Sequence, residues 1–287
     1  PEIIFSKRVK IVELIGDITA GLKHHLIHRG QIIGSLNYTE QEIFAAELLG
    51  TVHVDVFKKY FEEFSLGKGG KPSVEELEMT IRESLVLFNY IVGNHEEWQK
   101  ENGHTPGVTF RDKLIGILNR AIGRYLDEQG FFTPRLEDII RSKTIELPEY
   151  EAIHSFPDGT CTELLHPRMG RTKTTSIRME EAFDFSHCQR VDTANYHTSF
   201  MQEKWDSDIG QRVGVQAGAM TPLTYFEHGK LKRIDFGPVY VGDRCKNGRI
   251  FMSEHEFFNK PILQRPISKD MDINRLKEKL NLLRAPM

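Results

Sequence analysis

Residues 39–64 read TEQEIFAAELLGTVHVDVFKKYFEEF, a stretch in which apolar side chains recur every three or four residues. That period is typical of one buried face of an α-helix. Thr39 and Glu42 have the spacing of a capping box, in which two side chains bind backbone N–H groups at a helix start. The stretch therefore predicts a long helix that begins near Thr39.

The rest of the first half carries similar helix-start signals. The capping-box spacing recurs at Ser73 with Glu76 and at Thr109 with Asp112. A Thr-Pro pair opens one further short helix, since proline is tolerated at the first helical position. The predicted helices are residues 73–92, which end at Gly93-Asn94, residues 111–128, and the short helix after Thr133-Pro134. We therefore expect residues 1–143 to form a helical N-terminal bundle.

Turn signals replace these cap signals after Ile145. Asn247-Gly248, between apolar runs at 239–244 and 249–253, is the strongest hairpin signal, because both residue types accept the positive φ of a tight turn. The other predicted elements are a turn at Pro157-Asp158-Gly159, a hairpin over 223–234 and a C-terminal helix over 273–283. The expected fold class is α+β, with a helical domain at 1–143 and a β-rich domain at 146–287.

The overall composition is that of a globular chain. Hydrophobic residues make up 39% of 287, and 38 basic against 41 acidic side chains give a net charge of −3. The hydrophobic content is high enough to form a buried core. The slightly negative net charge excludes a protein whose whole surface binds polyanions. We find no Walker A loop, no Gly-x-Gly-x-x-Gly after a strand and no alternation of strands with helices. These absences argue against Rossmann and TIM-barrel folds.

Cysteine usage and apolar runs bear on location. Cys161, Cys188 and Cys245 are an odd number in a chain large enough to fold without disulfides, which favours reduced thiols. The longest uncharged stretch, residues 213–226, contains Pro222 and is shorter than the roughly 20 apolar residues that span a bilayer. We expect a cytoplasmic, intracellular protein without a membrane partner. The alternative location is a virion.

One group of metal-ligand types lies near the N-terminus. On a predicted helix, Glu13, Asp17, His24 and His28 all fall on one stripe, and carboxylates with imidazoles are common ligands of divalent metals. Apolar residues occupy the opposite side of that helix, so a solvated polar face gives the same pattern. We retain Asp17, His24 and His28 as candidate ligands of a divalent metal.

Two further groups of reactive residues have a plainer explanation. His53-Val54-Asp55 has the spacing of an iron-binding triad, but residues two apart on a helix diverge, so we expect His53 in or near the core. Cys188, with His187, Asp192 and His197 nearby, has the parts of a thiol nucleophile. No strand–turn–helix elbow surrounds Cys188, so a free structural cysteine is the default prediction.

The strongest local anomaly is residues 166–178, HPRMGRTKTTSIR, which hold four basic and four hydroxyl side chains and no acid. Such a segment suits phosphate groups, because Arg and Lys supply charge and hydroxyls complete the hydrogen bonds. Further basic residues flank two predicted hairpin turns. The candidate contacts to phosphate or nucleic acid are Arg168, Arg171, Lys173, Arg178, Lys230, Lys232, Arg244, Lys246 and Arg249. A contact to an acidic subunit, or a solvated loop, explains the same residues.

Two functions follow from these groups, and the sequence leaves open whether the chain is an enzyme. The first is a non-enzymatic, homo-oligomeric assembly or nucleic-acid-associated protein, for instance part of a viral particle, that uses its basic loop and hairpin tips. The alternative is a metal-dependent hydrolase with a His and carboxylate site in the helical half. We favour the first because no complete catalytic set is visible in the sequence.

Overall fold

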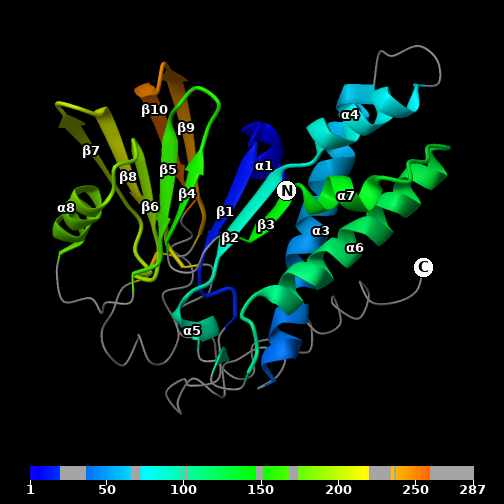
Figure 1. Cartoon of the computed structure of the whole chain (residues 1–287), viewed down its shortest axis with the longest axis horizontal. Helices are drawn as coiled ribbons and strands as arrows, with labels where there is room; N and C mark the ends of the chain where they lie inside the picture. The colour runs from blue at the N-terminus through cyan, green and yellow to red at the C-terminus, as the bar shows by residue number, and fades with distance from the viewer. Residues whose placement is uncertain are drawn as a thin grey trace. The chain divides into compact units, whose positions relative to one another are not determined.

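The computed structural model in Figure 1 divides the chain into two compact units. Unit 1 comprises residues 1–22, 37–154 and 163–168, and unit 2 comprises the remainder. This division differs from the expected boundary at 143–146, because residues 163–168 return to unit 1. The structure describes residues 1–19, 37–65, 72–97, 99–100, 103–146, 151–167, 174–219, 234–235 and 237–258.

Unit 1 contains a parallel sheet of three strands in the order β1-β2-β3. These strands are β1 (Ile11–Ile15), β2 (Leu87–Ile91) and β3 (Thr144–Glu146). Ile11 lies opposite Leu87 and Ile15 opposite Ile91, so β1 and β2 end at the same level. Parallel neighbours require long crossover connections, which helices provide here.

The helices of unit 1 lie between these strands in the sequence. They are α1 (Glu2–Ser6), α3 (Tyr38–Ser65), α4 (Val74–Ser84), α5 (Asn94–Glu97), α6 (Val108–Glu128) and α7 (Leu136–Arg141). In Figure 1, α3, α6 and α7 lie on one side of the β1-β2-β3 sheet. Because side chains alternate along a strand, Phe88 and Tyr90 of β2 pack with these helices in the main core.

The helices expected from residue 39 to residue 141 are found, but the helical bundle is not confirmed. The capping box of Ser73 with Glu76 is present, yet its helix ends at Ser84, and residues 87–91 form β2. Residues 11–15, which we placed on a helix, form β1. Short apolar runs such as IVELI and LFNYI fit a buried strand as well as a helix, so their periodicity could not decide. Strands and helices therefore do alternate in unit 1.

A second, seven-stranded sheet has the order β4-β5-β6-β8-β10-β9, with β7 paired to β8. Its strands are β4 (Glu151–Ser155), β5 (Cys161–Leu165), β6 (Arg190–Thr193), β7 (Phe200–Asp206), β8 (Gly210–Gln216), β9 (Val239–Lys246) and β10 (Arg249–Phe257). The pairing is mixed, since β6 runs parallel to β8 and β7 antiparallel to it. The mixture of helices and strands agrees with the expected α+β class.

Unit 2 also contains α8 (Thr175–Phe185), which packs on the sheet beside Gly214 of β8. A Cβ at Gly214 would overlap Met179 and Phe183, so the absence of a side chain lets the helix approach the strand. The predicted hairpin at Asn247-Gly248 is confirmed, with both residues at positive φ between β9 and β10. The predicted hairpin over 223–234 lies almost wholly, and the helix over 273–283 wholly, outside the described residues.

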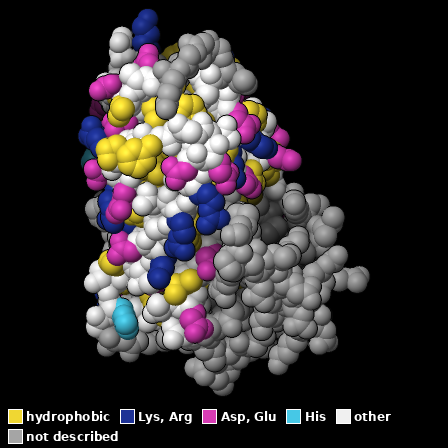
Figure 2. Space-filling model, turned by 90° about the vertical axis from the view of Figure 1, so that its right-hand side faces the viewer, with side chains coloured by type: hydrophobic (Ala, Val, Ile, Leu, Met, Phe, Trp, Pro, Cys, Tyr) yellow, Lys and Arg dark blue, Asp and Glu magenta, His cyan; other side chains and the backbone are white. Residues whose placement is uncertain are grey.

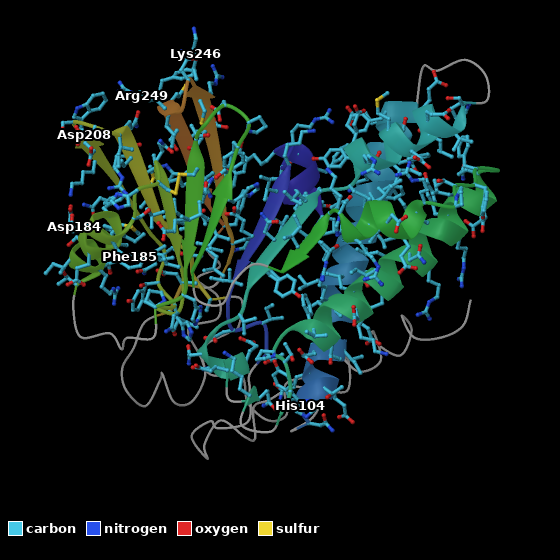
Figure 3. All side chains as sticks on the ribbon, in the orientation of Figure 1. His104, Asp184, Phe185, Asp208, Lys246 and Arg249 are labelled. Carbon is cyan, nitrogen blue, oxygen red and sulfur yellow. A yellow bond between two sulfur atoms is a disulfide. The ribbon has the colours of Figure 1, made fainter. Side chains whose placement is uncertain are left out.

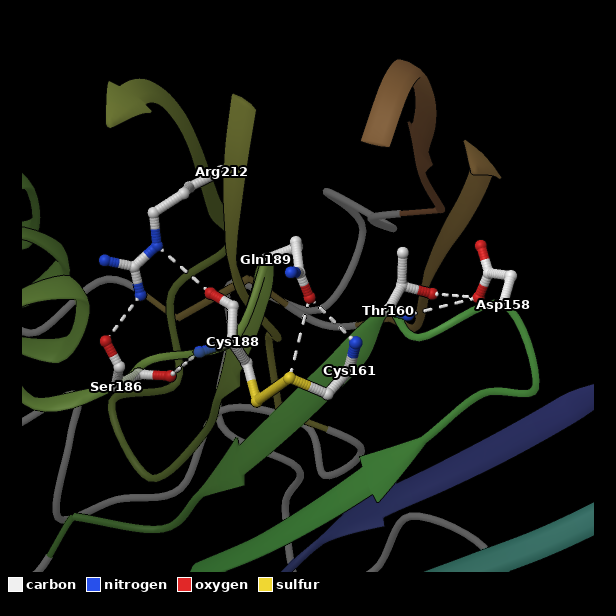
Figure 4. Close-up of a disulfide and its surroundings, with 7 residues drawn as sticks. All are labelled: Asp158, Thr160, Cys161, Ser186, Cys188, Gln189 and Arg212. Carbon is white, nitrogen blue, oxygen red and sulfur yellow. Dashed lines mark hydrogen bonds between the residues drawn. A yellow bond between two sulfur atoms is a disulfide. The ribbon is translucent and has the colours of Figure 1, made fainter. Parts of the chain in front are cut away.

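Cys161 and Cys188 form a disulfide, which Figure 4 shows with its surroundings. The expectation of three reduced thiols is therefore wrong for this pair, and only Cys245 is a free cysteine. Gln189 accepts a hydrogen bond from the backbone N–H of Cys161 at 2.8 Å, next to the bridge. The buried guanidinium of Arg212 donates to the carbonyl oxygen of Cys188 at 3.0 Å. The pairing depends on folding, because β5 brings Cys161 beside the segment that precedes β6.

Among the described residues, no helix is both long enough and apolar enough to cross a membrane.

Candidate functional site

Three strand ends of unit 1 meet on one small apolar cluster. Ile15 ends β1, Ile91 ends β2 and Leu164 lies near the end of β5, and these side chains pack with Ala152 of β4. The chain leaves each of these strands through polar residues. In open sheets with parallel strands, ligand sites form where the carboxyl ends of the strands meet. This cluster therefore fixes the base of a candidate site.

Asp17, Asn94 and His166 are the polar residues that follow these strand ends. The Nε2 atom of His166 lies 3.0 Å from Oδ1 of Asn94 and 3.3 Å from Oδ2 of Asp17. Metal–ligand bonds to nitrogen and oxygen are about 2.0–2.1 Å for zinc and magnesium, so neighbouring ligands at right angles lie roughly 3 Å apart. Both oxygens therefore lie at a distance from Nε2 of His166 that neighbouring ligands of one cation would have.

The imidazole of His166 is held in the orientation that a metal ligand needs. Its Nδ1 lies 2.8 Å from the carbonyl oxygen of Ile15, an acceptor only, so Nδ1 carries the proton and donates. Nε2 faces two acceptor oxygens, Asn94 Oδ1 and Asp17 Oδ2, so it also donates in this structure, and a cation bound there would take the place of that proton. The side chain of His166 is 1% exposed, so the surrounding residues fix the ring.

Two glycines allow the strand ends to approach so closely. Gly16 has a φ of +72°, and a Cβ there would overlap the ring of His166. A Cβ at Gly93 would overlap the backbone N and the Oδ1 atom of Asp17. Asp17 itself has a φ of +50°, a conformation that non-glycine residues adopt uncommonly. Such outliers are often found at functional sites.

The carboxylate of Glu96 lies behind the candidate ligands and is almost completely buried. It accepts hydrogen bonds from the backbone N–H groups of Gly93, Asp17 and Thr19 and from the hydroxyl of Thr19. Burial and the negative charge of Asp17 raise the pKa of Glu96, whereas these donors favour its ionised form. Glu96 thus binds both loops that carry candidate ligands.

The pKa of the Asp17 carboxyl is lowered although the group is largely buried. Burial opposes its ionisation, but the hydrogen bond to His166 and the charge of His95 prevail and lower the pKa of Asp17. Burial likewise opposes protonation of His166, yet the Asp17 carboxylate outweighs it and raises the pKa of His166. The pair is therefore a carboxylate with an imidazole that attracts a positive charge, whether a proton or a metal ion.

His95 lies beside Asp17 and is closer to solvent than His166. Its backbone N–H donates to Oδ1 of Asp17 at 3.1 Å, and its Nε2 lies 4.0 Å from Oδ2 of the same carboxylate. The side chain is 23% exposed, compared with 1% for His166. His95 is thus placed between the buried cluster and solvent, where an imidazole can exchange protons.

Of the three predicted metal ligands, only Asp17 lies among the residues that the structure describes. Asp17 lies in the candidate site, whereas His24 and His28 lie outside the described residues. Within the described part of the chain, no group of three or more His, Cys, Asp and Glu side chains is arranged to hold a metal ion. The candidate site therefore depends on the amide oxygen of Asn94 as its third ligand.

The predicted basic contacts are only partly described. Arg168, Arg171, Lys173, Lys230 and Lys232 lie outside the described residues. Arg178 lies on α8 and stacks on the ring of Tyr196 at 4.0 Å, so it has a packing role.

The remaining predicted cations, Arg244, Lys246 and Arg249, are exposed around the β9–β10 turn, and Figure 3 shows Lys246 and Arg249 at its tip. On the face seen in Figure 2, basic and acidic side chains are interspersed.

The other reactive groups have structural explanations in the described residues. His53 is 4% exposed and stacks on Phe88, so the core role we expected for it is confirmed. Cys188 is bridged to Cys161 and is neither a nucleophile nor a free structural thiol. Asp192, which we grouped with that thiol, pairs with Arg190 instead.

Sequence reasoning missed Asn94 entirely and recorded His166 only as the first residue of the basic run. The available signal was a glycine and a polar residue after a short apolar run, as in IVELIGD at 11–17 and LFNYIVGN at 87–94. We interpreted Gly93-Asn94 as a helix stop, because the preceding run was assigned to a helix. A strand assignment would have placed Asp17 and Asn94 at neighbouring strand ends.

Comparisons with known proteins do not assign a family. No protein-family model matches the chain, and no curated protein matches it. Among solved structures, it is similar to a crystal structure of Vps29 from Entamoeba histolytica complexed with Zn²⁺, at 9% sequence identity and a TM-score of 0.26. The similarity covers 45% of this chain and 77% of that one. A TM-score this low supports no inference about fold or function.

Proposed function

We propose that this protein is a metal-dependent hydrolase whose divalent cation is bound by Asp17, Asn94 and His166. The observation that carries the proposal is the approach of Nε2 of His166 to within 3.0 Å of Asn94 Oδ1 and 3.3 Å of Asp17 Oδ2. Two oxygens at these distances from one imidazole nitrogen, on side chains that follow three strand ends, would suit neighbouring ligands of one cation.

The donor types limit which metals fit. One imidazole nitrogen with a carboxylate and an amide oxygen is a hard to intermediate set, which suits Mn²⁺, Fe²⁺, Zn²⁺ or Mg²⁺ better than a soft metal. A cation bound there would act as a Lewis acid and make a bound water a better nucleophile near neutral pH. The absence of thiolate ligands among the three also distinguishes the site from structural zinc sites, which are usually rich in cysteine.

The protein's own proton carrier in this proposal is His95. Its backbone is tied to Asp17, and its ring nitrogen lies 4.0 Å from the Asp17 carboxylate, on the more exposed side of the cluster. An imidazole so placed can give a proton to a leaving group or take one from water.

The basic run suggests an anionic substrate, namely a phosphate ester. Arg168, Arg171 and Lys173 follow the candidate ligand His166 by two, five and seven positions in the sequence. Guanidinium and ammonium groups bind phosphate oxygens through charge-assisted hydrogen bonds, and phosphoryl transfer needs such charge compensation. The nearness of this run to His166 in the sequence is the support for a phosphate ester as substrate.

The test combines metal content with hydrolysis. We expect one equivalent of transition metal by elemental analysis after reconstitution with Mn²⁺, together with hydrolysis of p-nitrophenyl phosphate. Asp17→Asn and His166→Ala should each lose both. His104→Ala, an exposed histidine of unit 1, should keep both and is the matched control. Wild-type protein that binds no Mn²⁺ or Zn²⁺ contradicts the proposal.

Binding of a polyanion by a homo-oligomer remains a second proposal. Its support is the exposure of Arg244, Lys246 and Arg249 around one hairpin turn. If these residues contact nucleic acid, affinity for a short DNA duplex should fall steeply with salt, and a triple substitution to Ser should flatten that dependence. Equal binding by wild type and the triple variant excludes this role, and light scattering would show whether the chain is an oligomer.

A further inference from the structure

We infer that Glu96 is a positioning residue that sets metal affinity without touching the metal, by joining the two loops that carry Asp17 and Asn94. The inference rests on the proposed metal site. The first ligand loop is residues 16–19, after β1, and the second is residues 93–94, after β2. These loops are not adjacent in the sequence, so something must fix their separation.

The carboxylate of Glu96 spans the two loops with four hydrogen bonds. Its Oε2 accepts from the backbone N–H of Gly93 at 3.0 Å and from that of Asp17 at 3.0 Å. Its Oε1 accepts from the backbone N–H of Thr19 at 2.6 Å and from the Thr19 hydroxyl at 3.0 Å. Each oxygen therefore takes two donors, and one oxygen bonds to both loops at once.

Only an ionised carboxylate satisfies all four donors. Its two oxygens offer about four acceptor positions and no donor, which matches the four N–H and O–H groups. A glutamine places an NH₂ group against one pair of donors, so two buried donors lose their acceptor. A buried donor without an acceptor is unfavourable, so the loops would shift to find other partners.

Such a shift would act directly on the candidate ligands. One of the four donors is the backbone N–H of Asp17, and another belongs to Gly93, which precedes Asn94. Asp17 also has a positive φ of 50°, a conformation that persists only where the surroundings enforce it. Glu96 accepts hydrogen bonds from both loops, at Asp17 and at Gly93, so its loss should separate Asp17 from Asn94.

Glu96 is not itself placed to bind the cation, because both of its oxygens face backbone N–H groups of the loops. Residues that orient metal ligands typically change affinity by about 10–100-fold when they are replaced. We therefore expect Glu96→Gln to weaken Mn²⁺ binding by about tenfold or more. Thr19→Val leaves the Glu96 carboxylate in place and changes the size of residue 19 little, but it removes the hydroxyl, one of the four donors. It should therefore weaken Mn²⁺ binding by a smaller factor.

The experiment is calorimetric titration of the full chain with Mn²⁺, well below the melting temperature of each metal-free variant. Glu97→Gln removes the same charge one residue further along α5 and should leave the dissociation constant unchanged within about twofold. Glu96→Asp keeps the charge but is too short to bond both loops, so it should behave like Glu96→Gln. A residue needed only for stability would lower the melting temperature and leave the dissociation constant of the folded protein unchanged.

The outcomes separate this inference from the proposed function. Wild-type protein that fails to bind Mn²⁺ contradicts both. Wild-type protein that binds Mn²⁺, with Glu96→Gln and Thr19→Val binding equally well, supports the metal site and overturns the role of Glu96. If Glu96→Gln fails to fold, Thr19→Val, a milder change at the same hydrogen-bond set, decides the question alone.

Discussion

Oδ2 of Asp17 lies 3.3 Å from Nε2 of His166, although Asp17 follows the first strand of the chain and His166 the fifth. The carboxylate lowers the cost of a positive charge at this point, and the imidazole has a second nitrogen bonded to the carbonyl oxygen of Ile15. A proton or a divalent cation between the two groups is stabilised by both. This contact is the centre of the proposed site.

Metal binding should stabilise the folded chain through Asp17. A ligand that binds only the native state adds about 2.7 kcal/mol when its free concentration is 100 times its dissociation constant. We expect the melting temperature of the wild type to rise with added Mn²⁺ and to fall back with a chelator. Asp17→Asn should melt at the same temperature with and without Mn²⁺. An equal rise in both proteins would place the metal elsewhere.

Replacement of Gly93 by alanine adds only one methyl group but should strongly weaken metal binding. The added Cβ would overlap the backbone N and Oδ1 of Asp17, so the two ligand loops must separate. We expect Gly93→Ala to lose Mn²⁺ binding and to be less stable by about 1–3 kcal/mol. Gly116→Ala is the control, because a Cβ there meets nothing within 4 Å on α6.

The two alanine variants should therefore change the free energy of unfolding in opposite directions. Alanine in place of glycine within an exposed stretch of helix stabilises by up to about 1 kcal/mol, so Gly116→Ala should raise stability and leave metal binding unchanged. Urea unfolding with a parallel metal titration measures both effects. If Gly93→Ala binds Mn²⁺ like the wild type, the loops are not as close as described here.

Stability should fall with acid because of His53. Desolvation in the core lowers the pKa of His53 to about 4, from an ordinary value of 6.5, so the folded protein holds the neutral ring. The unfolded chain takes up a proton first, so this contribution is present above about pH 6.5 and is lost as pH falls toward 4. Between about pH 7.5 and pH 5 we expect a loss of about 2 kcal/mol.

His53→Leu should remove this part of the pH dependence. Leucine cannot be protonated and fits a site that packs against Phe88, so unfolding free energy should vary less between those two pH values. Chemical denaturation at each pH gives the comparison. An unchanged slope in the variant would show that His53 takes up its proton in the folded state as easily as in the unfolded one.

The disulfide should contribute measurably to unit 2. Cys161 and Cys188 are separated by 27 positions, and a bridge across a loop of that size lowers the entropy of the unfolded chain by an amount worth about 3.5 kcal/mol of stability. We expect the Cys161→Ser, Cys188→Ser double variant to melt at a lower temperature and to be insensitive to a reductant. Cys245→Ser retains the bridge and should respond to the reductant as the wild type does. Equal melting of oxidised and reduced wild type would contradict the bridge.

Elements whose cause lies within a few residues could be predicted from the sequence. The capping box of Ser73 with Glu76 marks the start of α4, and the turn at Asn247-Gly248 joins β9 to β10. Both signals depend on the backbone preferences and hydrogen bonds of neighbouring residues, which the local sequence contains. Asp17 was chosen as a candidate ligand from helical spacing, which fails because residues 11–15 form β1, so its place in a metal site stays a proposal.

The tertiary structure alone decided what Asp17 faces. IVELI and LFNYI are short apolar runs that fit a helix or a buried strand, and only pairing of β1 with β2 selects the strand. That pairing, with β5 beside it, brings Asn94 and His166 to Asp17. His24 and His28, the partners we expected from helical spacing, lie outside the described residues. The disulfide of Cys161 with Cys188 has the same origin, because residues far apart in sequence meet only when packing of the core makes their strands neighbours.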